Sequence, residues 1–293
     1  MGQIRRGISV IWDLTAPLLL YMIICDGTVQ VWQIVSGGIA ETQGLAAGGL
    51  GAAIAVVPLG IWYRKLRGER RRMYVQEERA GQEKRAMQEG RAVQEKRAMQ
   101  EGSAGQESCT GRRTGMTAAD VGTTIMLAVG FCIFLNNLLM LLDPLSAGFE
   151  RAGQLLSGPS LAVQILSVGL VIPLAEELVF RGFAYERLRE VLSVRGAVAA
   201  SAVYFGLFHG NLVQGIYATV FGVILALLCE RYDSLTAAWL FHGAANLTSI
   251  LVTALGLQRL LAARRSWMAA AAAAGGILIL YSAYKIKKGK KTT

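Results

Sequence analysis

The chain has 293 residues, of which 53% are hydrophobic and only 17% are charged. Soluble domains carry about a quarter charged residues, so this composition excludes both an ordinary soluble enzyme and a disordered protein. The net charge of +10 comes without a basic stripe that alternates with aromatic residues. It therefore fits the excess of Lys and Arg in cytoplasmic loops better than it fits nucleic-acid binding. We expect a polytopic protein of the cell membrane with the lipid bilayer, and no nucleic acid, as a partner.

Eight apolar stretches approach the length of about 20 residues that a helix needs to cross a bilayer. The fifth of them, which starts at Val194, is the shortest. The sequence therefore predicts an all-α integral membrane protein with about eight transmembrane helices. We expect these helices at Ile8–Ile24, Leu45–Tyr63, Ala118–Leu142, Leu161–Phe183, Val194–His209, Leu212–Cys229, Leu235–Leu255 and Trp267–Tyr284.

Basic residues flank alternate ends of these helices, which predicts that both termini and the linker at 64–117 are cytoplasmic. The segment Arg259–Arg265 is the exception, because an alternating count places it on the opposite side. The chain accordingly divides into four parts. These are an N-terminal transmembrane hairpin at 1–63, a basic low-complexity linker at 64–117, a membrane core at 118–256, and a C-terminal helix with a lysine-rich tail at 257–293.

The linker contains a six-residue repeat that begins QEERAG at Gln76. Six residues advance an α-helix by about 600°, so equivalent positions fall on three different faces. No continuous apolar seam results, and a coiled coil is therefore not expected. The composition allows a solvated helix without a chemical role.

Two adjacent carboxylates and an arginine lie within the fourth apolar stretch, in the pattern EExxxR. Charged residues in membrane spans are costly and are candidates for function. On a helix, Glu177 and Arg181 are four residues apart and can pair on one face. Glu176 points about 100° away and lacks that partner. A carboxylate held out of water in this way is suited to proton transfer.

The two histidines of the chain both lie in apolar segments that follow the carboxylates. His209 ends the pattern FxxxH, and His242 begins the pattern HxxxN, which ends at Asn246. His242 and Asn246 are one helical turn apart, so both can donate hydrogen bonds toward a developing oxyanion. Asn211 and Gln214 are further polar residues that we expect near this site.

The three patterns EExxxR, FxxxH and HxxxN, in this order on successive apolar segments, resemble the CAAX protease and bacteriocin-processing family. This family, also called CPBP or Abi, includes the type II CAAX prenyl endopeptidases, and the resemblance covers about Ser157 to Thr253. It implies an intramembrane endopeptidase that acts on a peptide or lipidated-protein substrate, or that serves in bacteriocin processing or immunity. Residues 118–256 would then be the catalytic membrane core.

The resemblance also implies a role for each matching residue. Glu176 with His209 would activate a water, and His242 with Asn246 would form the oxyanion site. Glu177 and Arg181 would support the helix or hold the substrate. No metal ion or other cofactor is implied.

Three alternatives to a metal-free protease are compatible with the sequence. Glu176, His209 and His242 are enough to supply the three ligands of a catalytic zinc, although HExxH is absent. A non-proteolytic protein for immunity or scaffolding would use the same fold. A transporter or channel would use the carboxylates as an ion site, but no inverted repeat supports it.

Overall fold

The computed structural model describes residues 2–38, 43–96, 116–142, 158–209 and 211–288, and every regular element in these ranges is helical. The prediction of an all-α membrane protein is confirmed. The eighth expected span is helix α8 (Val194–Leu207), which is apolar but only 14 residues long. Within the described residues, seven helices are long and apolar enough to cross a membrane: Val10–Ser36, Gly44–Met73, Ala118–Leu141, Leu161–Val191, Leu212–Tyr232, Leu235–Ala254 and Arg265–Lys288.

Contacts divide the chain into two units, one formed by Met1–Leu59 with Thr114–Thr293 and the other by Gly60–Arg113. Helix α2 (Gly44–Lys96) is longer than the expected span and includes the first three six-residue repeats, 76–93. The repeats from residue 97 onward, and the last five residues of the lysine-rich tail, lie outside the described residues.

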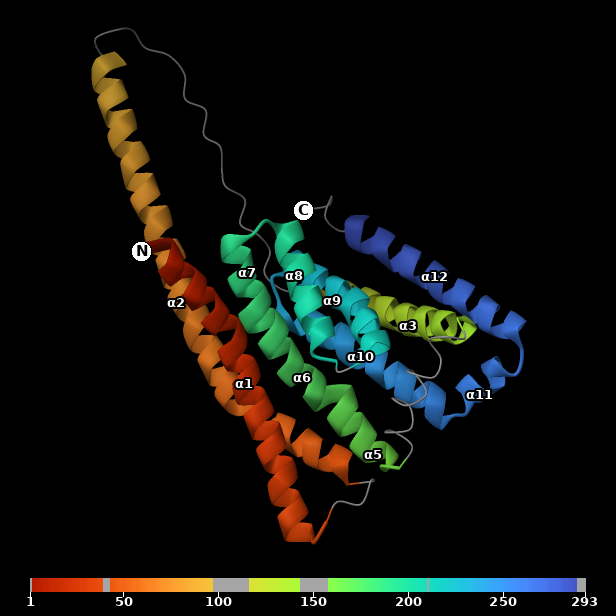
Figure 1. The fold of residues 1–293 in the computed structure, drawn as a ribbon. Helices are drawn as coiled ribbons and strands as arrows, with labels where there is room; N and C mark the ends of the chain where they lie inside the picture. Colours follow the sequence, from red (N-terminus) through yellow and green to blue (C-terminus); the bar gives the residue numbers. More distant parts are fainter. Residues whose placement is uncertain (1, 39–42, 97–115, 143–157, 210, 289–293) are drawn as a thin grey trace. The chain divides into compact units, whose positions relative to one another are not determined.

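The helix that carries the carboxylates consists of five consecutive segments, two of them π-helical. Figure 1 labels three of the segments, α5, α6 and α7, along its length. Pro173 offers a reason for the first change in winding, because proline has no N–H to donate to the preceding turn. The N–H of Ile172 bonds the carbonyl of Ser167, five residues back, which is the wide spacing of a π-helix. The segments are α5 (Leu161–Gln164), η1 (Ile165–Val171), α6 (Ile172–Glu177), η2 (Leu178–Tyr185) and α7 (Glu186–Val191).

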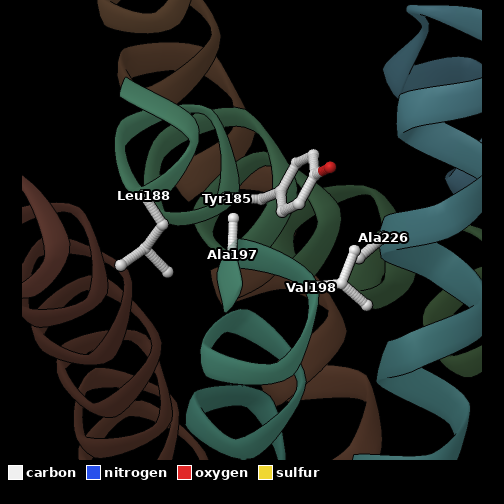
Figure 2. Close-up of a cluster of buried hydrophobic side chains, with 5 residues drawn as sticks. All are labelled: Tyr185, Leu188, Ala197, Val198 and Ala226. Carbon is white, nitrogen blue, oxygen red and sulfur yellow. The ribbon is translucent and has the colours of Figure 1, made fainter. Parts of the chain in front are cut away.

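Polar side chains start the helices that follow. Ser193 caps α8, and Asn211 caps α9 (Leu212–Tyr232), each by accepting a hydrogen bond from a backbone N–H in the first turn. Helix α10 (Leu235–Ala254) comes next. A cluster of buried hydrophobic side chains joins η2, α7, α8 and α9, and Figure 2 shows its members Tyr185, Leu188, Ala197, Val198 and Ala226.

Helix α1 (Gly2–Ser36) extends beyond the expected end at Ile24 and is fastened to the core by two polar contacts. Arg187 Nε lies 2.8 Å from Asp13 Oδ2, and the Tyr204 hydroxyl donates to the carbonyl of Leu14 at 3.0 Å. These bonds link α1 to α7 and α8. Polar groups among apolar helices need partners, so these two bonds fix the position of α1 beside the helix that carries the carboxylates.

Helix α3 (Ala118–Leu141) packs along α12 (Arg265–Lys288), and the short α11 (Leu257–Ala262) precedes α12 (Figure 1). Gly275 lies where the backbones of α3 and α12 meet, since a Cβ there would come within 2.6 Å of the Phe134 nitrogen. Small residues allow this close approach between membrane helices.

Candidate active site

Glu176 and Glu177 end α6, and both side chains point into the protein interior. Their exposed fractions are 9% and 0%. Glu177 Oε1 accepts a hydrogen bond of 3.2 Å from Arg181 Nη1, which is the expected pairing one turn along the helix. No hydrogen bond joins Glu176 to another described residue. The two neighbouring carboxylates therefore have different surroundings.

Arg181 is only 1% exposed and is held by three groups. Besides the bond to Glu177, its Nη2 donates to the carbonyl of Gly222 at 3.3 Å, and its Cζ lies 4.3 Å from the centre of the Phe205 ring. A cation over an aromatic face is stabilised by the ring's quadrupole. Gly222 has no side chain, so α9 comes close enough for its carbonyl to receive this bond: a Cβ at Gly222 would lie 3.2 Å from Arg181 Nη2.

His242, on α10, lies between the two carboxylates. Its Nδ1 is 2.7 Å from Glu177 Oε1, and its Nε2 is 3.7 Å from Glu176 Oε2. Phe205 and Phe221 present their rings edge-on to the imidazole at centroid distances of 6.0 and 5.0 Å. A carboxylate bonded to one ring nitrogen sets the orientation of the other. Glu177 thus orients His242 so that Nε2 faces Glu176.

His209 lies in the turn that follows α8. Its Nδ1 is 2.9 Å from the carbonyl of Phe205, one turn earlier, and its ring is 4.6 Å from the Phe205 ring. Both histidines are within electrostatic range of the Glu176 carboxylate. Phe205 contacts Arg181, His209 and His242, which gives the phenylalanine of the FxxxH pattern a physical role as their shared packing partner.

Asn246 contacts the π-helical segment η1. Its Nδ2 donates to the carbonyl of Val168 at 2.8 Å. Val168 is five residues before Pro173, which cannot donate a backbone bond, so the asparagine replaces a missing main-chain donor. Trp239, one residue that the sequence did not single out, donates in the same way to the carbonyl of Leu170 at 2.9 Å. These two bonds hold α10 against η1. The bond to Val168 uses only one of the two amide N–H groups of Asn246.

Asn211 and Gln214 contact one another at the start of α9. Asn211 Oδ1 accepts from the backbone N–H of Gln214 at 2.9 Å, and its Nδ2 donates to Gln214 Oε1 at 2.7 Å. Asn211 is exposed. These bonds explain both residues as parts of a helix cap. Their expected location beside the substrate stays a prediction.

Tyr21 is a second residue that the sequence did not indicate. It is buried on α1, its ring centre is 6.2 Å from that of Phe208, and it lies within electrostatic range of Glu176. Its position depends on how α1 docks on the core, and no spacing in the sequence carries that information.

Among the described residues, no group of three or more His, Cys, Asp or Glu side chains is arranged to hold a metal ion. A cavity of about 300 Å³ lies beside α3, η1 and α10 and is almost entirely apolar. Its lining includes Leu170, Trp239 and Leu247 but none of the carboxylates or histidines. The cavity is therefore separate from the cluster around Glu176.

These features define a polytopic membrane protein that buries two carboxylates, an arginine and a histidine among its helices. Residues 158–248, about a third of the chain, match the family model described as type II CAAX prenyl endopeptidase Rce1-like. Over this region the chain is similar to the CAAX protease family, in agreement with the resemblance of its three patterns. No curated protein and no solved structure matches the chain. Helices α1, α2, α3, α11 and α12 lie outside the matched residues.

Proposed function

We propose that the chain is an intramembrane endopeptidase that hydrolyses a peptide bond with an activated water. The observation that carries the proposal is the unequal bonding of the two buried carboxylates. Glu177 is bonded to Arg181 and His242, whereas Glu176 lies beside His242 Nε2 without an ion pair to Arg181. A general base must be free to accept a proton, and Glu176 meets that condition.

In the proposed reaction, Glu176 takes a proton from water while the water oxygen attacks the peptide carbonyl carbon. His209 lies near enough to support this transfer electrostatically. The carbonyl oxygen becomes negative as the tetrahedral intermediate forms. The C–N bond then breaks, Glu176 returns the proton to the leaving nitrogen, and a carboxylate and an amine are the products.

His242 and Asn246 are the proposed donors to the oxyanion. His242 can bond Glu177 through Nδ1–H and the oxyanion through Nε2–H only when both ring nitrogens carry protons. Asn246 would use the amide N–H that does not bond Val168.

The proposed substrate is a peptide or lipidated protein that reaches the site from the bilayer and is cut near its C-terminus. The proposal needs no metal ion, and the proton transfers involve only side chains of this chain. The membrane family match supports peptidase chemistry and a bilayer environment in general terms.

Cleavage of C-terminal peptides by the purified protein in detergent tests the function. A pool of prenylated and unprenylated peptides would be incubated with native protein and with the Glu176→Gln variant, and the products identified by mass spectrometry. We expect cleavage by the native protein alone, and the same rate after chelation in protein verified to be metal-free. Activity lost on chelation and restored by Zn²⁺ would replace this mechanism with a zinc-dependent one. Cleavage by both proteins would mean that Glu176 is not the base.

Replacing Asn246 with Ala is expected to lower kcat about 10²-fold while KM stays near its native value, because an oxyanion donor acts mainly in the transition state. Trp239→Phe is the matched control, since it removes the other side-chain bond from α10 to η1 without removing a donor at the site. Steady-state kinetics of both variants provide the measurement. Equal losses of kcat would show that Asn246 acts by holding η1.

A further inference from the structure

Nine residues of α2, Arg64–Arg72, concentrate positive charge directly after an apolar stretch. They contain six Arg or Lys and one Glu, a net charge of +5. Trp62 and Tyr63 come immediately before them. Tryptophan and tyrosine are enriched at the boundary between hydrocarbon and headgroups, so this basic segment begins where a membrane span reaches the lipid headgroups.

Four of the basic side chains form two rows on one side of the helix. Arg64 and Arg71 are seven residues apart, as are Lys65 and Arg72, and all four are exposed. Seven residues make nearly two turns of an α-helix, so each pair lies along one line. We call these four residues the basic patch.

A shallow hollow lies on the same side of α2. Gly68, which has no side chain, lies between the two rows and leaves the space open. The hollow is lined by Gly68, Arg71, Arg72, Val75, Gln76 and Arg79. Arg71 and Arg72 line this space, and the guanidinium group of an arginine can bond a phosphate through two N–H groups.

The charge does not continue along the linker. Residues 76–101 contain six basic and six acidic residues, so the repeats that follow have no net charge. From Tyr63 to Arg72 the helix rises about 14 Å. That length is about the depth of a headgroup layer plus one Debye length at physiological salt. The net positive charge is therefore restricted to the part of α2 within reach of lipid phosphates. A nucleic-acid site would not need to be limited to this distance from the membrane.

We propose that the basic patch binds the phosphate groups of anionic phospholipids in the bilayer that the chain spans. Arg64 and Lys65 contact the headgroups nearest the hydrocarbon, and Arg71 and Arg72 contact phosphates farther out. This assignment is independent of peptide hydrolysis, because it concerns α2 residues outside the family match.

Lipid binding to the full-length protein tests the proposal. Phosphatidylglycerol or phosphatidylcholine would be titrated into detergent micelles of the protein, and retained lipids counted by native mass spectrometry. The test variant is R64Q/K65Q/R71Q/R72Q. Its matched control, K84Q/R85Q/R91Q/K96Q, removes the same number of charges from the repeats. Thermal unfolding of both variants would be measured beside the native protein.

We expect the patch variant to bind phosphatidylglycerol at least about tenfold more weakly than native protein and the control to bind it as native protein does. The native protein, the patch variant and the control should bind phosphatidylcholine equally, and more weakly than the native protein binds phosphatidylglycerol. Equal losses in both variants would overturn the proposal, because they would reflect overall charge. The proposal would also be overturned if the native protein bound phosphatidylglycerol and phosphatidylcholine with equal affinity. A short RNA is the remaining competitor. If the RNA binds the native protein more tightly than phosphatidylglycerol does and displaces that lipid, and if it does not bind the patch variant, the patch would be assigned to nucleic acid instead.

Discussion

The Glu176→Gln protein is expected to fold like the native protein and to cleave peptide with a kcat about 10³-fold lower. Glutamine has nearly the shape of glutamate but cannot accept a proton from water at neutral pH. Glu176 has no ion pair to Arg181, so its neutralisation leaves the bonds of Glu177 to Arg181 and His242 in place. KM should therefore change little, because the loss falls on the transition state.

Steady-state kinetics and thermal unfolding in the same detergent would measure both effects. Glu83→Gln is the matched control, since Glu83 is an exposed glutamate of α2. It should leave kcat, KM and the unfolding temperature unchanged. A Glu176→Gln protein with native kcat would remove Glu176 from the mechanism. An unchanged kcat with a raised KM would assign it to substrate binding.

Replacing Arg181 with Met is expected to lower the free energy of unfolding by about 3–5 kcal/mol. The change leaves Glu177 charged and buried with His242 as its remaining partner, and it removes the bond to the Gly222 carbonyl. A buried ion that loses its partner bears its full desolvation cost. Adding Glu177→Gln should restore part of the stability, because the unpaired charge is then absent.

Arg189→Met provides the comparison for Arg181. Arg189 pairs with Glu230 at 3.1 Å, but its side chain is 31% exposed, so water can replace the lost partner. We expect a loss of about 0–1 kcal/mol there. Denaturant unfolding of the three variants, followed by far-UV circular dichroism in detergent, would compare them. Similar losses for Arg181→Met and Arg189→Met would mean that the interior of the site is well hydrated.

The local part of the site could be predicted because it depends on one helix. The four-residue spacing of Glu177 and Arg181 predicts their bond from helical geometry alone, and the bond is present at 3.2 Å. Apolar length likewise predicted the membrane helices, although α1 continues to Ser36 where the apolar pattern weakens around Asp26.

The contacts between helices could not be predicted in the same way. His242 and Glu177 are 65 residues apart, and their contact depends on the rotation and depth of α10 against α6. Predicting the bond from Asn246 to Val168 would require knowing that the chain before Pro173 is π-helical. Hydrophobic periodicity does not distinguish a π-helix from an α-helix. Tyr21 is within electrostatic range of Glu176 in a helix that docks on the core through bonds at Asp13 and Leu14, among other contacts.

The π-helical winding on both sides of α6 has a consequence for how related chains can differ in length. A π turn accommodates about one residue more than an α turn. Deleting one residue from η1 would therefore allow the segment to rewind as α-helix while the chain on either side keeps nearly the same rotation. A one-residue difference within η1 or η2 between related chains is thus expected to leave Glu176 and Glu177 facing His242.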